Sequence, residues 1–162
     1  MSPASQVVNS SHVMSCDRWR YLLLSGGVLA ADRLSKWAVI STIPPGTSRS
    51  LWDDFLRLSH AHNTGSAFGI LPGHNGLFLA LAAISSLGIV IALFLLPLPG
   101  AWSRVGLSLI LGGALGNLVD RALWGYVLDF IDFRFWPAFN LADAALVLGA
   151  LVLGIGLLRG RE

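Results

Sequence analysis

Carboxylate and amide side chains in the last third of the sequence have types and spacing that suit chemistry. They are Asn117, Asp120, Asp129, Asp132, Asn140 and Asp143. The first two and the last two of these form Asn-x-x-Asp pairs, and residues three apart share one face of a helix. Two neighbouring carboxylates tend to share one proton, and such a pair can activate a water molecule while it polarises a carbonyl group. The pattern therefore indicates aspartic-peptidase chemistry as a candidate.

The composition is that of an apolar chain. Of its 162 residues, 54% are hydrophobic and only 12% are charged, and the mean hydropathy is +0.68. Soluble domains carry about 25% charged residues, so we predict a one-domain membrane protein. The net charge of +2 is small and the basic residues lie beside apolar segments, which argues against nucleic acid as a partner. Cys16 is the only cysteine, which excludes a disulfide within the chain and a cysteine-based metal site.

Four long apolar segments must position these polar residues. The predicted fold is an all-α polytopic membrane protein with transmembrane helices at about residues 19–40, 77–98, 102–124 and 138–158. Residues 1–17 are polar and have no hydrophobic period, so we expect a disordered cytoplasmic lead before a single membrane domain at 18–161. The loop 41–75 alternates apolar and polar residues around Phe55 to Ser59, which predicts a small β-containing region outside the membrane.

Five arginines fall on one side of this four-helix arrangement, and they predict that both chain termini lie in the cytoplasm. They are Arg18, Arg20, Arg104, Arg159 and Arg161. At ~1.5 Å per helical residue, Asp32, Asp120 and Asp143 lie ~18–24 Å from that side and share one level near the outer leaflet. A carboxylate at the bilayer centre costs ~2.5–3.5 kcal/mol, so these three should face one another or water.

Spacing alone leaves the roles of the acidic residues open. Two of them can form a reacting pair, or all of them can pair with cations and hold loops and helix ends together. The available cations are Arg33, Lys36, Arg121 and Arg134. Physical reasoning does not choose the reacting pair from Asp32, Asp120, Asp129, Asp132 and Asp143. Carboxylates within a helix bundle also suit a small proton- or ion-coupled transporter, although no inverted repeat or broken helix is evident.

Five short motifs follow one another along the chain. They are Asp32-Arg33-Leu34-Ser35-Lys36, Asn63-Thr64-Gly65-Ser66-Ala67-Phe68, Gly116-Asn117-Leu118-Val119-Asp120-Arg121, Val127-Leu128-Asp129-Phe130 and Phe139-Asn140-Leu141-Ala142-Asp143. In this order they resemble the motifs of the lipoprotein signal peptidase family, the bacterial signal peptidase II, over roughly residues 18–160. The resemblance implies an intramembrane aspartic endopeptidase of the bacterial inner membrane, with its active site toward the outer leaflet. Such an enzyme removes signal peptides from prolipoproteins by cutting before a diacylglyceryl-modified cysteine.

The resemblance also implies roles for individual residues. The catalytic dyad maps onto Asp129 and Asp143, and an aspartic dyad needs only water, so no cofactor is implied. Residues expected to support the dyad or bind substrate are Asn63, Gly65, Asn117, Asp120, Arg121 and Asn140. An Asx turn is the alternative for Asn63 and Gly65. Asp32 and Lys36 are one helical turn apart and are expected to form a structural polar pair. Membrane lipid is the other expected partner, and the sequence leaves the oligomeric state open.

Two further patterns have structural interpretations. Gly112 and Gly116 have small-xxx-small spacing, which predicts close packing of two helices. The loop histidines His60, His62 and His74 have no acidic partner at the spacing of a zinc site, so we expect no metal there.

Overall fold

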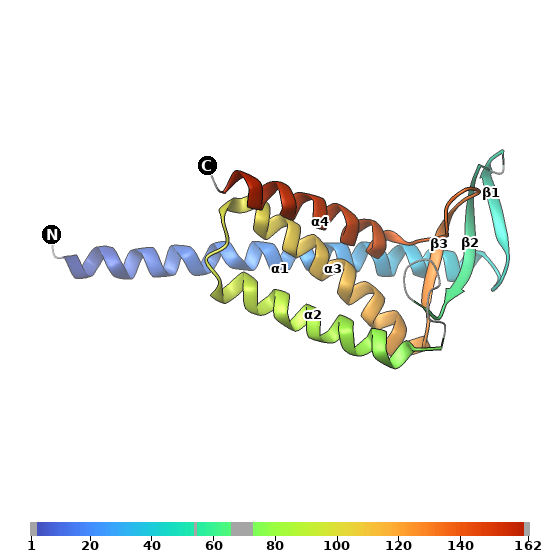
Figure 1. Cartoon of the computed structure of the whole chain (residues 1–162), viewed down its shortest axis with the longest axis horizontal. Helices are drawn as coiled ribbons and strands as arrows, with labels where there is room; N and C mark the ends of the chain where they lie inside the picture. Colours follow the sequence, from blue (N-terminus) through green and yellow to red (C-terminus); the bar gives the residue numbers. More distant parts are fainter. Residues whose placement is uncertain (1–2, 54, 66–72, 161–162) are drawn as a thin grey trace.

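The computed structural model describes residues 3–53, 55–65 and 73–160, with side chains from residue 18 onward. Its helices and strands are α1 (Pro3–Thr42), β1 (Ser48–Trp52), β2 (Leu56–Asn63), α2 (Asn75–Leu95), α3 (Gly100–Trp124), β3 (Val127–Phe133) and α4 (Leu141–Arg159). The helices lie side by side, the sheet covers one end of the bundle, and both termini lie toward the other end (Figure 1). The predicted mostly helical fold with a small β region is therefore observed. Ser66, Ala67, Phe68 and Arg161 lie outside the described residues.

Three helices in the described part of the chain are long and apolar enough to cross a membrane, namely α2, α3 and α4. α1 is not among them, because Asp32, Arg33 and Lys36 interrupt its apolar segment. Four transmembrane helices therefore remain a prediction, with three supported by length and composition. α3 has half of its apolar window buried, against 11% for α2 and 17% for α4, so α3 is the central helix of the three.

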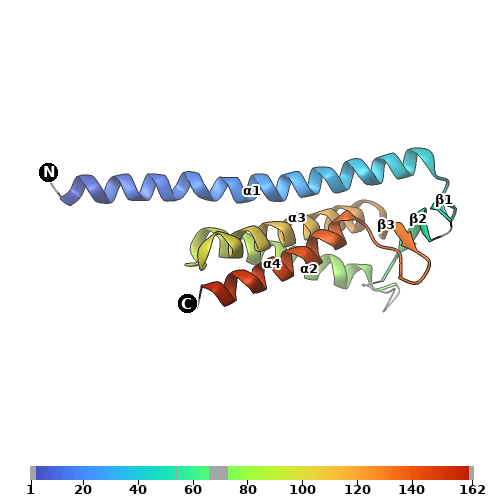
Figure 2. The same ribbon diagram turned by 90° about the horizontal axis from the view of Figure 1, so that it is seen from above.

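α1 begins earlier than the sequence predicted. Residues 3–17 were expected to form a disordered lead, whereas the helix starts at Pro3 and extends well beyond the ends of its neighbours (Figure 2). A helix satisfies its backbone hydrogen bonds locally, so it can continue past the last neighbour that packs against it. The hydrophobic pattern that guided the prediction indicates which residues of a helix are buried. It does not indicate at which residue the helix begins.

The other helix boundaries follow from local chemistry. α2 ends at Leu95, three residues before the predicted end, because Leu96 adopts an extended conformation in front of Pro97. α4 begins at Leu141, three residues after the predicted start, because Asn140 is its N-cap. The Asn140/Asp143 pair was expected to share a helix face, and it instead forms a capping box in which each side chain bonds the other residue's backbone N–H.

Glycines allow the helix backbones to approach one another closely around α3. A methyl group added at Gly149 of α4 would lie 2.8 Å from the carbonyl oxygen of Gly106 on α3. On the side facing α1, a methyl at Gly112 would lie 2.7 Å from the carbonyl oxygen of Ser25. The predicted close packing at Gly112 is therefore observed, and a second glycine contact joins α3 to α4.

The sheet has the order β1-β2-β3, and both strand pairs are antiparallel. β3 comes from the connection between α3 and α4. The β2–β3 register slips between Leu58 and Ala61, which pair with Ile131 and Asp129 respectively. Three steps along β2 therefore match two steps along β3, so β2 carries a β-bulge beside Asp129. The chain then folds back through a bridge between Ile131 and Phe139.

The close approach of α3 and α4 makes Gly149 intolerant of a side chain. We expect Gly149→Ala to lower the free energy of unfolding by about 1–3 kcal/mol, because overpacking forces the backbones apart. Gly154→Ala is the matched control on the same helix, since its added methyl meets nothing within 4 Å and alanine favours a helix. Unfolding of both variants in detergent measures the difference, and equal stability of the two would contradict this packing.

Candidate active site

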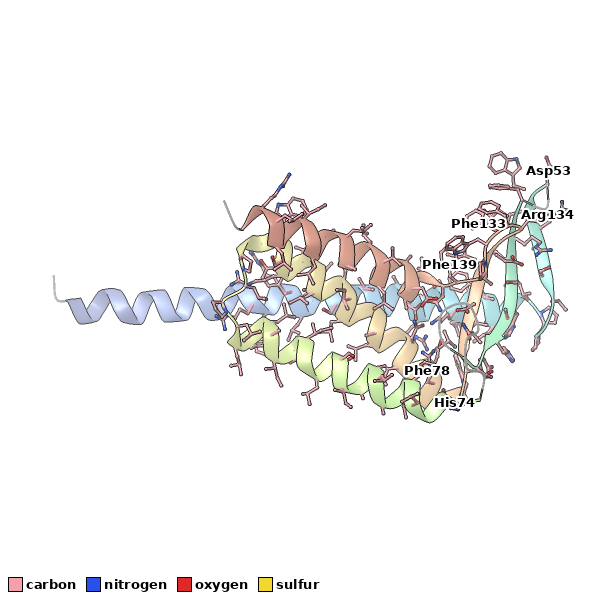
Figure 3. The ribbon with its side chains drawn as sticks, in the orientation of Figure 1. Asp53, His74, Phe78, Phe133, Arg134 and Phe139 are labelled. Atoms are coloured by element: carbon pink, nitrogen blue, oxygen red, sulfur yellow. The ribbon has the colours of Figure 1, made fainter. Side chains whose placement is uncertain are left out.

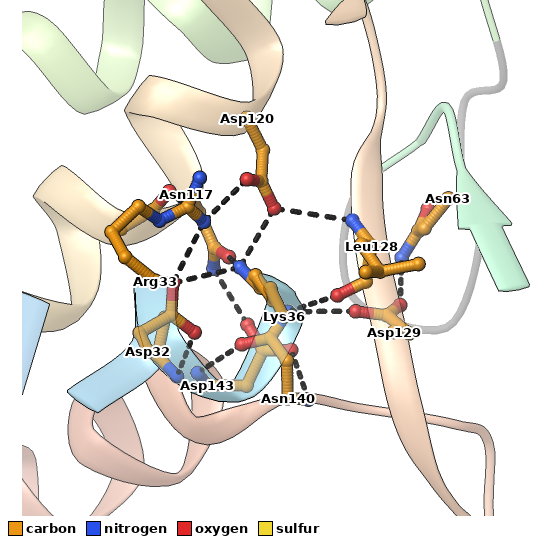
Figure 4. Close-up of polar contacts among 12 residues, drawn as sticks. Asp32, Arg33, Lys36, Asn63, Asn117, Asp120, Leu128, Asp129, Asn140 and Asp143 are labelled. Carbon is orange, nitrogen blue, oxygen red and sulfur yellow. Dashed lines mark hydrogen bonds and ion pairs between the residues drawn. The ribbon is translucent and has the colours of Figure 1, made fainter. Parts of the chain in front are cut away.

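Asp129 lies in the buried part of β3, with 3% of its surface exposed. The flanking Leu128 and Phe130 pack with Val39 of α1 and with Ile43, which follows the end of α1, and this fixes the strand against the bundle. The Asp129 carboxylate accepts one hydrogen bond on each oxygen. Asn63 of β2 donates from its amide at 3.0 Å, and Asn140 donates from its amide at 2.7 Å (Figure 4). Asp129 is therefore held by two neutral donors from opposite sides.

Asp143 lies in the first turn of α4, where the capping box orients it. Its Oδ2 accepts the backbone N–H of Asn140 at 3.3 Å, while the side chain of Asn140 accepts the backbone N–H of Asp143 at 2.9 Å. The other carboxylate oxygen accepts a hydrogen bond from the Asn117 amide of α3 at 2.8 Å. The Asn140 amide also lies 3.2 Å from the Asn117 oxygen, so both asparagines connect Asp143 to Asp129.

A buried ionic cluster lies beside the two aspartates. Lys36 of α1 is 2.9 Å from Asp32 and 2.7 Å from Asp120 of α3, and these three side chains are at most 1% exposed. Arg33 also pairs with both carboxylates, at 2.8 Å from Asp32. The expected Asp32–Lys36 pair is thus in contact, and it is part of a larger group. Asp120 was expected to support the dyad, yet its side chain contacts these cations and the backbone N–H of Leu128.

Asn63, Gly65 and Arg121 are joined by hydrogen bonds beside Asp129. The Asn63 oxygen accepts the Gly65 backbone N–H at 3.0 Å, which is the Asx turn considered as an alternative, while its amide still bonds Asp129. Arg121 donates to the Gly65 carbonyl oxygen at 2.9 Å and lies over the Phe78 ring, 5.5 Å from its centre. Asn75 donates to the backbone carbonyl of Arg121 at 3.2 Å. Sequence reasoning missed Asn75 and Phe78, which belong to no recognised motif.

A cavity of about 660 Å³ brings five of the predicted site residues together, whereas Gly65, Asp120 and Asn140 are not among its lining residues. Its polar lining is made by Asn63, Asn117, Arg121, Asp129 and Asp143. Its apolar lining comes from residues 136–139 and from one side of α4 that includes Leu146, Val147, Leu148 and Leu151. Sequence reasoning did not single out this apolar wall, because leucine and valine on a membrane helix carry no distinguishing signal.

The segment before α4 is folded back onto the sheet and forms one edge of this cavity. Phe139 exchanges backbone hydrogen bonds with Ile131 at 2.8 and 3.0 Å. Its ring stacks on Phe133, with the ring centres 6.1 Å apart, and Figure 3 shows both side chains beside β3. This contact fixes the position of Asn140, the next residue, relative to the strand that carries Asp129.

The geometry separates the five acidic residues that spacing left open. Asp129 and Asp143 line the cavity, and Asp32 and Asp120 are buried in ion pairs. Asp132 is 2.9 Å from Arg57 on β2, and it lies three positions after Asp129 along β3, which is an odd number of steps. Its side chain therefore points to the other face of the sheet. Among the described residues, three of these carboxylates form ion pairs and no ion pair joins the other two to a cation, so the interpretation as ion pairs applies to Asp32, Asp120 and Asp132.

The electrostatic environment favours a proton on Asp129. Burial, followed by the charge of Asp143, raises the pKa of Asp129 to about 7. Hydrogen bonds from Asn63 and Asn140 and the charge of Lys36 act in the opposite direction. A carboxyl group with this pKa can donate a proton or accept one near neutral pH. Among the described residues, no group of three or more His, Cys, Asp and Glu side chains is placed to hold a metal ion.

Asn140 has two roles in this site: it caps the N-terminus of α4, and its amide donates a hydrogen bond to Asp129. We expect Asn140→Ala to lower the free energy of unfolding by about 1–3 kcal/mol, since it removes a cap and leaves buried groups unpaired. Asn75→Ala removes one hydrogen bond at the start of α2 and serves as the control. Thermal unfolding in detergent compares them, and an Asn140 variant as stable as the Asn75 variant would contradict this role.

Comparison with known proteins places the chain among bacterial membrane peptidases. A family model described as signal peptidase (SPase) II matches residues 24–159. A lipoprotein signal peptidase of Moorella thermoacetica is 43% identical over 133 residues, which cover 82% of this chain and 89% of that protein. One from Syntrophomonas wolfei is 43% identical over 138 residues, which cover 83% of this chain and 88% of that protein.

Solved structures agree with these relatives. A bacterial membrane enzyme determined by the in meso method at 2.3 Å resolution superposes with a TM-score of 0.79 at 31% identity, covering 88% of this chain and 90% of that chain. A second, at 1.9 Å resolution, gives 0.74 at 32% identity and covers 86% and 92%. The predicted family is confirmed, and the transporter alternative receives no support. This multi-pass membrane protein belongs to the signal peptidase II family.

Proposed function

We propose that this protein is an intramembrane aspartic endopeptidase that removes signal peptides from prolipoproteins. Its cut falls before the diacylglyceryl-modified cysteine, and Asp129 and Asp143 form the catalytic dyad. The observation that carries the proposal is that these two carboxylates, from β3 and α4, line one cavity without a cationic partner among their described hydrogen bonds. The family membership and the named relatives support the substrate class.

The dyad divides the work of peptide hydrolysis between its members. We assign the proton to Asp129, because burial and the charge of Asp143 raise its pKa to about 7. Asp143 lies in the first turn of α4, where the free N–H groups favour a negative charge. The Asp143 carboxylate removes a proton from a water molecule, whose oxygen forms a bond to the scissile carbonyl carbon. Asp129 gives its proton to the carbonyl oxygen, so a neutral tetrahedral intermediate forms.

Collapse of this intermediate completes the reaction. The proton held by Asp143 passes to the amide nitrogen, the C–N bond breaks, and Asp129 takes back the proton from the hydroxyl group as the new carboxyl group forms. The dyad thus returns to its starting state. Asn63 and Asn140 keep the Asp129 oxygens in place, and Asn117 does the same for Asp143. These amides supply fixed dipoles where bulk water would otherwise have to reorganise.

We further propose four membrane spans, with α1 as the fourth and both termini in the cytoplasm of a bacterial inner membrane. Arginines at one end of the bundle support this orientation. Arg104 lies in the first turns of α3, Arg159 ends α4 and lies over Trp102, and Arg18, two residues before Arg20 on α1, donates to the Phe94 carbonyl oxygen near the end of α2. The cavity then opens toward the outer leaflet. Its apolar wall on α4 suits a substrate whose signal peptide and acyl chains remain in lipid, so membrane burial orients the scissile bond before reaction.

The dyad assignment predicts loss of activity in two variants. With a purified diacylglyceryl-modified prolipoprotein in detergent, we expect wild type to cleave and Asp129→Asn and Asp143→Asn to lose at least about 10³-fold in kcat, since neither amide can transfer the required proton. Asp132→Asn removes a carboxylate from the other face of β3 and should retain activity. Cleavage by a folded dyad variant would require the dyad to be reassigned, and an inactive folded wild type would reject the function itself.

The pKa of Asp129 predicts a pH dependence. Because the proton is needed, kcat should fall as pH rises through about 7, where Asp129 ionises. The Asn63 hydrogen bond lowers this pKa, so Asn63→Ala should move the falling limb to higher pH while it reduces the maximum rate. Rates measured from pH 5 to pH 9 on one substrate test both expectations. A limb that stays in place, or moves to lower pH, would show that Asn63 does not act on this proton.

A further inference from the structure

Each aspartate of the proposed dyad follows a residue whose backbone is tied to the buried ionic cluster. The N–H of Leu128, one residue before Asp129, donates to Asp120 at 3.1 Å. The N–H of Ala142, one residue before Asp143, donates to Asp32 at 3.1 Å. Leu128 and Ala142 are fully buried, so water does not replace these bonds. In both cases, the backbone N–H of the residue before a dyad aspartate donates to a carboxylate of the ionic cluster. One of these bonds is made by the strand β3 and the other by the first turn of α4.

Lys36 joins the two arrangements. Its ammonium group lies 2.9 Å from the Asp32 carboxylate and 2.7 Å from the Asp120 carboxylate, and Figure 4 shows it between them. It also lies 3.4 Å from the Asn117 oxygen, and the amide of Asn117 bonds Asp143. Lys36 thus contacts both carboxylates that accept these backbone N–H groups, and it also contacts Asn117, one of the amides that bond the dyad.

The packing around this group leaves little freedom for the carboxylates to move. A methyl group at Gly116 of α3 would lie 2.8 Å from the Asp32 carboxylate oxygen and 3.0 Å from the Ala142 side chain. α3 therefore approaches Asp32 and the start of α4 as closely as a glycine allows. A displacement of Asp32 or Asp120 would be transmitted through a single hydrogen bond to the peptide unit next to a dyad residue.

We propose that Lys36 is a positioning residue that sets the separation of the Asp129 and Asp143 carboxylates through Asp32 and Asp120. This inference rests on the proposed function, because it concerns the geometry of that dyad. The sequence indicated only a structural Asp32–Lys36 pair. The geometry adds a path in each direction: from Lys36 through Asp120 and Leu128 to β3, and from Lys36 through Asp32 and Ala142 to α4. Among the described residues, no hydrogen bond or ion pair joins Lys36 to either dyad carboxylate, so it positions them through its neighbours.

Four variants separate positioning from general stability. Lys36→Met removes the charge at similar length, and Lys36→Arg restores it. Asp120→Ala removes the acceptor of the Leu128 N–H, whereas Asp120→Asn keeps an oxygen in its place. Each is measured for kcat and KM on the lipidated prolipoprotein, and amide hydrogen exchange is measured at Leu128 and Ala142 in ¹⁵N-labelled protein. Asp132→Asn, which removes a carboxylate of the separate Arg57 pair, is the control.

Positioning predicts a distinct pattern across these measurements. Lys36→Met should lower kcat by about 10²-fold, with KM changed only a few-fold, because a small displacement of the dyad affects the reacting geometry and not substrate binding. Exchange should become faster at both amides in Lys36→Met and only at Leu128 in Asp120→Ala. Lys36→Arg and Asp120→Asn should each recover part of the lost rate. Asp132→Asn should change neither amide.

Other outcomes would reject the positioning role of Lys36, and they can be distinguished from a failure of the proposed peptidase function. If Lys36→Met is folded and exchanges faster at both amides but keeps its kcat, positioning is rejected. If Lys36→Met does not fold, the Asp120 variants decide, since Lys36 and Arg33 still have Asp32 as partner in them. Equal kcat for Asp120→Ala and Asp120→Asn would then reject the inference. A folded wild type that fails to cleave rejects the function, and that result is independent of the exchange pattern.

Discussion

Burying polar groups away from water is the constraint on which this structure depends. An unpaired charge or amide inside an apolar helix bundle costs several kcal/mol, so every such group has to find its partner within the protein. Here the partners come from different elements. Asp32 and Lys36 come from α1, Asn117 and Asp120 from α3, and Asn140 from the turn before α4. Because these groups must pair with one another, their contacts fix the position of β3 relative to α1, α3 and the start of α4.

The site separates full charges from neutral dipoles. Asp129 and Asp143 accept hydrogen bonds from the amides of Asn63, Asn117 and Asn140. Lys36 and Arg33 lie one layer further away, on Asp32 and Asp120, and Arg121, which also lines the cavity, donates to the Gly65 carbonyl oxygen. An arginine or lysine directly on Asp129 would lower its pKa and remove the proton that the proposed mechanism uses. Amide groups can orient a carboxyl group by hydrogen bonds without adding a positive charge that would favour its ionised form. The arrangement thus provides a rigid site in which one carboxyl group can still titrate near neutral pH.

The sequence predicted much of this site because its polar residues are conspicuous in an apolar chain. Spacing and hydropathy placed Asp32, Asp120 and Asp143 at one level, and the motifs separated Asp129 from Asp132. The ties from Leu128 and Ala142 could not be predicted, because they use backbone N–H groups that any residue type carries. The early start of α1 was missed for a related reason, since helical hydrogen bonding uses backbone groups and requires no hydrophobic period in the sequence. The apolar cavity wall looked like any lipid-facing helix.

The bulge in β2 has a consequence for how this chain tolerates changes in length. Residues directly opposite each other share a face of the sheet, so Leu58 faces with Ile131, and Ala61 and Asn63 face with Asp129 and Val127. Ile131 and Asp129 are on the same face, which puts Leu58 and Asn63 on it too, although regular alternation would separate residues five apart. The extra residue therefore reverses the alternation of side chains between the two faces of β2. Deleting one residue at the bulge would leave Leu58 and Asn63 four positions apart, so regular alternation would keep Asn63 on the face of Asp129. Deleting two would leave them three positions apart and turn Asn63 away, although every motif would stay intact, so the parity of this segment matters more than its length.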